Sequence, residues 1–145
     1  LPEFFEVHSW RVFTQLTGDG QTDTEVTVKL TAKGETQLVV GDGNGPVNAL
    51  DHAVKIALVP AYPVVESFDL IDYRVRILDS AHGTDAVVRV LISTTDGRRA
   101  WTTVGVGQNV VEASWEALRD ALVWGLIHSS DSHGGAEKAR RSQSA

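Results

Sequence analysis

The sequence predicts an α+β domain of two similar strand-strand-strand-helix units, with mainly antiparallel sheet. Two recurring patterns carry this prediction. Apolar residues alternate with polar ones in segments that end at hairpin-turn residues, which is typical of antiparallel strands. After each group of strands, a glycine-rich turn leads into a segment with apolar residues at helical spacing. Such helices cover one face of a sheet, and 145 residues suffice for one domain with a core.

An internal repeat supports the two-unit organisation. Residues 41–58 read GDGNGPVNALDHAVKIAL and residues 105–122 read GVGQNVVEASWEALRDAL, an offset of 64 residues (105 minus 41). The coinciding pairs are Gly41 and Gly105, Gly43 and Gly107, Val47 and Val111, Ala49 and Ala113, Ala53 and Ala117, Ala57 and Ala121, and Leu58 and Leu122. The paired glycines argue against a chance match between two alanine-rich helices.

The first unit is expected over residues 4–59. Val26, Val28 and Leu30 alternate with polar neighbours, as in a half-buried strand, and a Lys-Gly pair then predicts a hairpin turn. Strands are expected at about 4–14, around 26–30 and at 36–40. Two prolines, Pro60 and Pro63, end the helix that follows.

The second unit is expected over residues 70–127. Its first strand, 70–78, places Tyr73 and Val75 on one face, and Asp96-Gly97 marks its hairpin. The other strands are expected around 88–92 and at 99–106. Residues 129–145 have no periodicity and little apolar content, so a frayed or disordered tail is predicted there, outside a domain of residues 1–128.

Both helices carry start signals at the same repeat position. Gly45 is the expected N-cap of the first, with Pro46 at the first helical position. Asn109 is the expected N-cap of the second, and Glu112 follows at capping-box spacing. The apolar stripes behind these starts predict core. Their members are Val47, Leu50, Val54 and Leu58 in the first helix, and Val111, Trp115, Leu118 and Leu122 in the second.

The glycine-rich turn at Gly41, Gly43 and Gly45 has two interpretations. Spacing alone favours a tight strand-to-helix turn with no further role. Free N–H groups at a helix start also attract anions, so a carboxylate or a phosphate is the alternative ligand. The phosphate-loop pattern requires Lys and Ser or Thr where this chain has Pro46 and Val47. The dinucleotide fingerprint belongs to parallel strand-helix-strand units, whereas hairpins dominate here.

Composition narrows the functional class further. The net charge is -6, which argues against nucleic acid as a partner. Cysteine is absent, as in proteins of a reducing compartment such as the cytoplasm, and no apolar run reaches the roughly 20 residues of a membrane helix. The five histidines show no metal-binding spacing, and no catalytic motif is present. We therefore expect no catalytic residue, metal or cofactor, and the absence of methionine suggests a domain cut from a longer protein.

Four segments carry a resemblance to a known family. They are GDGNGPVNALDHAVKIAL, LIDYRVRIL, GTDAVVRVLISTTDG and WTTVGVGQNVVEASWEAL. Together they resemble the allosteric dimer domain at the C-terminus of 2-isopropylmalate synthases and related enzymes, over about residues 4–127. The runs DYRVRIL and WTTVGV look closer to the (R)-citramalate synthase branch.

The resemblance implies a role in feedback regulation. Full-length enzymes of this family condense acetyl-CoA with a 2-oxo acid on a metal-dependent TIM barrel, so divalent metal and acetyl-CoA are expected only there. The C-terminal domain dimerises and binds the end-product amino acid, isoleucine in citramalate synthases and leucine in 2-isopropylmalate synthases. We therefore expect a branched-chain amino acid, a second copy of the chain and a catalytic domain of the same polypeptide as partners.

The family pattern of first helix plus following strand selects the candidate effector residues. Polar contacts are expected from Gly43, Asn44 and Gly45, with Asp72 as the ammonium partner. The apolar slot is expected from Leu50, Ala53, Val54, Ala57 and Val75. The alanines fit equally well with close helix packing, and Asn109 marks a second, pseudo-equivalent position.

Two rival functions stay open on the sequence. The first rival to an effector-binding sensor is a structural dimerisation domain that binds no effector. An enzyme that uses the glycine-rich turns to hold a phosphate is the second rival.

Overall fold

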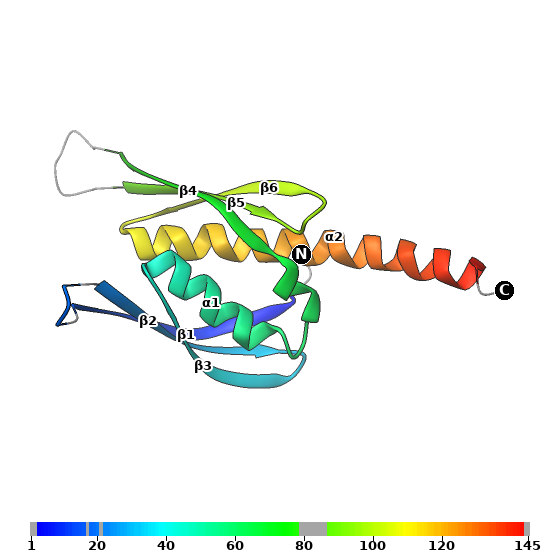
Figure 1. Cartoon of the computed structure of the whole chain (residues 1–145), viewed down its shortest axis with the longest axis horizontal. Helices are drawn as coiled ribbons and strands as arrows, with labels where there is room; N and C mark the ends of the chain where they lie inside the picture. Colours follow the sequence, from blue (N-terminus) through cyan, green and yellow to red (C-terminus); the bar gives the residue numbers. More distant parts are fainter. Residues whose placement is uncertain (1–2, 17, 21, 79–86, 144–145) are drawn as a thin grey trace.

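A computed structural model describes residues 3–16, 18–20, 22–78 and 87–143 (Figure 1). Its elements are β1 (Phe5–Leu16), β2 (Thr22–Ala32), β3 (Glu35–Gly43), α1 (Pro46–Leu58), the short 3-10 helix η1 (Pro63–Ser67), β4 (Asp69–Leu78), β5 (Val87–Thr95), β6 (Ala100–Gly107) and α2 (Val110–Gln143). The strands form two antiparallel sheets of three, ordered β1-β2-β3 and β4-β5-β6, and a helix follows each. The predicted pair of strand-strand-strand-helix units is confirmed.

The repeat extends to an irregularity in the strand pairing. The register of β1 on β2 shifts between Val7 and Ser9, and that of β4 on β5 shifts between Leu70 and Asp72. A bulge of this kind places one extra residue in a strand and changes which neighbours share a face. The two units therefore share a bend in their first strands as well as their order of elements.

Both helices lie between the two sheets (Figure 1). Helix α1 packs on β2 and β3, α2 packs on β5 and β6, and the two helices contact each other. The core consists of the apolar face of each sheet and the facing stripe of its helix. Its fully buried members include Val26, Val28, Leu30, Leu50, Val54, Leu58, Val90, Ile92, Leu118 and Leu122.

Glycines allow the helices to lie directly against the strands. A Cβ added to Gly41 would lie 2.6 Å from the backbone nitrogen of Ala53, and one added to Gly105 would lie 2.7 Å from that of Ala117. Real Cβ atoms do not approach backbone so closely, and neither glycine has a positive φ. The paired glycines are therefore explained by close helix-on-strand packing in both units.

The second helix is longer than the sequence indicates. The backbone is helical through Gln143, whereas the sequence predicts an irregular tail over 129–145. Residues 136–141 read AEKARR, which are good helix formers, whereas residues 129–135 read SSDSHGG and give no helix signal. The disordered tail over 129–145 stays a prediction. The domain boundary at residue 128 stays a prediction.

Candidate effector site

The start of α1 leaves backbone N–H groups without a cap. Gly45 is the N-cap, as predicted, and it has no side chain to accept a hydrogen bond. Pro46 contributes no N–H, and the carbonyl of Gly45 accepts the N–H of Ala49 at 3.0 Å. The N–H groups of Val47 and Asn48, in the first turn, therefore have neither a preceding helical turn nor a side-chain cap as acceptor.

The start of α2 is capped. The side chain of Asn109 accepts the N–H of Glu112 at 2.9 Å, and the carboxylate of Glu112 accepts the N–H of Gln108 at 3.2 Å. The predicted N-cap and its acidic partner are confirmed. The two units thus differ at the glycine-rich turn before each helix. The start of α2 is capped, whereas the start of α1 is free to bind an anion.

A cavity of about 350 Å³ opens beside the free helix start. It lies between the first turn of α1 and the beginning of β4. The lining residues are Val47, Asn48, Leu70, Ile71, Asp72 and Tyr73. Apolar side chains, a carboxylate and the residues with uncapped N–H groups therefore border one open depression, which suits an aliphatic ligand with polar ends.

Asp72 supplies the negative charge of this cavity. Its carboxylate accepts the N–H of Tyr73 at 2.9 Å and the Nε–H of Arg74 at 3.1 Å. Its side chain is 49% exposed, so the Arg74 contact is a screened surface pair rather than a buried one. An ionised carboxylate has about four acceptor positions, and two of them remain for a donor such as an ammonium group.

One turn further along α1, Asp51 and Lys55 form an ion pair of 3.0 Å. Burial is the main influence on Asp51 and raises the pKa of its carboxyl, while the Lys55 charge and hydrogen bond oppose this and the charge of Asp69 adds to it. The pair is part of the packed surface of α1 and does not line the cavity. Of Asp51, Asp69 and Asp72, Asp72 lines the cavity.

The structure divides the predicted site residues into two groups. Asp72 lines the cavity, Val75 follows on the same strand with 40% exposure, and Gly43, Asn44 and Gly45 lead into the helix start. The other predicted slot residues, Leu50, Ala53 and Val54, are fully buried in the core, and Ala57 lines a different cavity at the far end of α1. The sequence reasoning did not include Val47, Asn48, Leu70, Ile71 and Tyr73.

The turn before α1 differs from the phosphate-binding turn of dinucleotide-binding units. A Cβ on Gly43 would clash with the Asn48 side chain and lie 2.6 Å from the nitrogen of Ala49, so the turn is closed by its own helix. The sheets are antiparallel, unlike those of dinucleotide-binding units. Within the described residues, no three His, Cys, Asp or Glu side chains gather as metal ligands, and no helix there is long and apolar enough to cross a membrane.

The fold, the repeat and the helix starts agree with a known family. Residues 1–124 match the family described as the LeuA allosteric (dimerisation) domain. The chain belongs to this family. The resemblance inferred from the sequence is confirmed, and the match covers both strand-strand-strand-helix units.

Curated relatives carry the same domain within longer proteins. The chain is 53% identical over 125 residues to an (R)-citramalate synthase of Streptomyces coelicolor and 45% identical over 128 residues to one of Aquifex aeolicus. These alignments cover 86% and 88% of this chain but only 23% and 24% of the relatives. A 2-isopropylmalate synthase of Nitrobacter hamburgensis is 35% identical over 96 residues, which are 66% of this chain and 17% of that protein. The expected closeness to the citramalate synthase branch is confirmed, and the chain spans about a quarter of the two citramalate synthases.

Proposed function

We propose that this domain is the regulatory and dimerising part of an (R)-citramalate synthase-like acyltransferase and binds a branched-chain amino acid for feedback inhibition. Isoleucine is the favoured effector and leucine the alternative. Metal, acetyl-CoA and catalysis belong to the catalytic domain of the same polypeptide. The observation that carries the effector role is the cavity at the start of α1, where uncapped N–H groups, an acidic side chain and an apolar wall converge.

The proposed binding mode uses these three parts separately. The α-carboxylate of the effector accepts the N–H groups of Val47 and Asn48, favoured by the positive end of the helix dipole. The ammonium group donates to Asp72. The branched side chain packs against Leu70 and Tyr73, whose apolar surface otherwise faces water in this cavity.

The homodimer has its own structural support. Strand pairing places Tyr73, Val75 and Ile77 on the face of β4 that looks toward the helices, opposite the buried core of β5. These three side chains are nevertheless 38%, 40% and 65% exposed. Three adjacent apolar side chains at one edge form a surface that a second copy can cover, and it continues directly from the effector cavity.

A titration distinguishes an effector sensor from a structural dimerisation domain. We expect isoleucine to raise the melting temperature, because a ligand at a hundredfold excess over its Kd stabilises a folded domain by about 2.7 kcal/mol. Calorimetric competition between isoleucine and leucine ranks the two. Melting curves unchanged by millimolar isoleucine, leucine and valine would leave a purely structural dimerisation domain as the function. A preference for leucine would replace isoleucine as the proposed effector.

Asp72→Asn tests the ammonium contact. We expect isoleucine affinity to fall at least tenfold, because hydrogen bonds to charged groups contribute about 1.5–3 kcal/mol, while the melting temperature without ligand stays nearly unchanged. Asp120→Asn is the matched control, since Asp120 is also half exposed (51%) beside an arginine, Arg119. Equal isoleucine affinity in both variants would exclude Asp72 from the site.

Gly45→Asp tests the free helix start. The new carboxylate would cap the N–H groups that the effector needs and would repel its carboxylate. No atom lies within 4 Å of a Cβ at this position, so we expect stability to rise by a few tenths of a kcal/mol and isoleucine affinity to fall at least tenfold. Thermal unfolding and calorimetry measure the two effects. Undiminished isoleucine binding would place the carboxylate elsewhere.

A further inference from the structure

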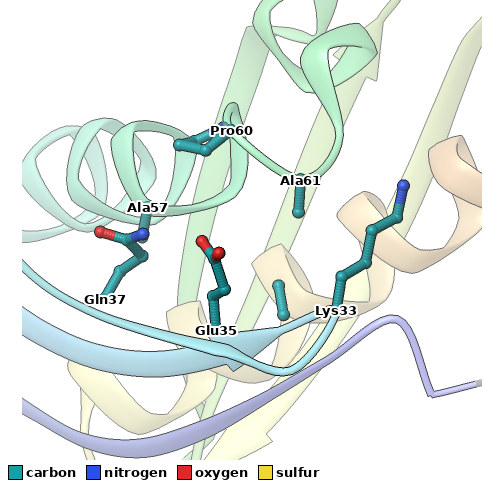
Figure 2. A pocket seen from close by; sticks show the side chains of 7 residues that line it. Lys33, Glu35, Gln37, Ala57, Pro60 and Ala61 are labelled. Atoms are coloured by element: carbon teal, nitrogen blue, oxygen red, sulfur yellow. The ribbon is translucent and has the colours of Figure 1, made fainter.

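A second cavity lies at the opposite end of α1 from the effector cavity. Figure 2 shows the side chains that line it. It is enclosed by the β2–β3 hairpin on one side and by the end of α1 on the other, and its volume is about 230 Å³. Its lining residues are Ala32, Lys33, Glu35, Gln37, Ala57, Pro60 and Ala61. The residue that the sequence assigned to the effector slot at this end, Ala57, thus belongs to a separate space.

Opposite charges line this cavity without pairing to each other. Lys33 and Glu35 are two residues apart around the hairpin, yet no ion pair joins them among the described residues. The Lys33 ammonium lies 4.8 Å from the centre of the Tyr62 ring. Figure 2 shows Glu35 and Gln37 pointing toward the end of α1, and Lys33 extending on the other side of Ala61. The hairpin therefore presents an anion and a cation at separate places on one wall.

The end of α1 adds acceptors to the side of the cavity that Glu35 faces. Pro60 has no N–H for the carbonyl of Ile56, and the N–H of Ala61 turns to the carbonyl of Leu58 at 3.0 Å. The carbonyls of Ile56 and Ala57 consequently receive no hydrogen bond from the backbone of the next turn. Together with the negative end of the helix dipole, they favour a bound ammonium group beside Glu35.

The remaining wall is small and apolar. Ala32 and Ala57 are buried, and Pro60 and Ala61 close the space above them. A water molecule occupies about 30 Å³, so the cavity holds on the order of eight such volumes. This leaves room for a compact aliphatic side chain.

We propose that this cavity is a second ligand site, separate from the effector cavity, and that it takes a small aliphatic α-amino acid. The ligand's carboxylate pairs with Lys33, its ammonium group donates to Glu35 and the carbonyl of Ala57, and its side chain packs on the alanines. Lys33 reaches the ligand by leaving the face of Tyr62. On binding, Lys33 loses its screened cation–π contact with Tyr62 and gains an ion pair with the ligand.

Titration of the full chain with L-alanine and L-valine, followed by backbone NMR and calorimetry, tests this proposal. We expect both amino acids to shift the signals of residues 33–37 and 57–61. Lys33→Gln and Glu35→Gln should each weaken binding at least tenfold, whereas Glu25→Gln, on the exposed side of β2, should not. Isobutylamine and isobutyrate, which each lack one of the two charges, should bind at least tenfold more weakly than L-valine.

Asp72→Asn separates this site from the effector site. It should leave the alanine and valine shifts at residues 33–37 unchanged, and Glu35→Gln should leave isoleucine binding at the start of α1 unchanged. No shift at these residues with millimolar alanine or valine would overturn the proposal, as would shifts that Asp72→Asn abolishes. Neither outcome affects the role of the effector cavity, which the isoleucine titration tests by itself.

Discussion

Gly105→Ala is expected to lower the free energy of unfolding by about 3 kcal/mol, at the upper end of the cost of overpacking a core. The added Cβ would coincide with the carbonyl oxygen of Ala113 and lie 2.7 Å from the backbone nitrogen of Ala117. Both are backbone atoms of α2, so they cannot move aside by a rotamer change. The helix would have to lift from β6 and open its contacts with the sheet. Urea unfolding followed by circular dichroism measures the loss.

Two further variants show whether this loss comes from helix packing. Gly41→Ala removes the corresponding glycine of the first unit and should also destabilise, since its Cβ would lie 2.6 Å from Ala53. Gly18→Ala is the control, because no atom lies within 4 Å of its Cβ and its φ is not positive. We expect Gly18→Ala to change stability by less than about 0.5 kcal/mol. A Gly105→Ala variant as stable as Gly18→Ala would contradict the close packing of α2 on β6.

The fold was predictable because several independent signals agree on it. Alternation in Val26, Val28 and Leu30 identifies a buried strand face, the hairpin turns identify antiparallel order, and the caps identify where the helices begin. The bulge at Ile71 has no such signal in the sequence. A strict period of two places Leu70 on the face of Asp72, whereas the bulge places Leu70 on the face of Tyr73.

This bulge explains part of what the sequence reasoning missed in the candidate site. It places Leu70 on the face of Tyr73 beside the start of α1, whereas a strict period of two places only Ile71 with Tyr73. The alanines were the other difficulty, because a small side chain on a helix makes room for a ligand or for a neighbouring backbone. The glycine opposite the alanine distinguishes a ligand from a neighbouring backbone. Gly41 lets β3 pack directly against Ala53, so the backbone of β3 fills the space beside this alanine. Of the predicted residues, Asp72 lines the cavity at the start of α1, whereas Leu50, Ala53 and Val54 are buried in the core; the effector residues stay a prediction.

Trp101→Ala is expected to destabilise the domain by about 3–5 kcal/mol, the usual cost of removing a large aromatic from a core. Trp101 is 8% exposed and joins three elements. Its ring meets the edge of Phe68 at 5.5 Å and stacks on Trp124 of α2 at 4.7 Å between centroids. The helix has a glycine, Gly125, where a Cβ would lie 2.9 Å from the Trp101 ring, so the space is shaped for this side chain.

Trp101→Phe separates the contribution of aromatic packing from that of the indole N–H hydrogen bond. The Nε1–H of Trp101 donates to the carbonyl of Ala121 at 3.0 Å in a buried setting. Phenylalanine keeps a ring between Phe68 and Trp124 but loses this hydrogen bond and part of the packed area, so we expect a smaller loss of about 1–2 kcal/mol. Urea unfolding of both variants, read by circular dichroism, gives the ratio. Equal losses would mean that the hydrogen bond, rather than the aromatic packing, fastens α2 to the second sheet.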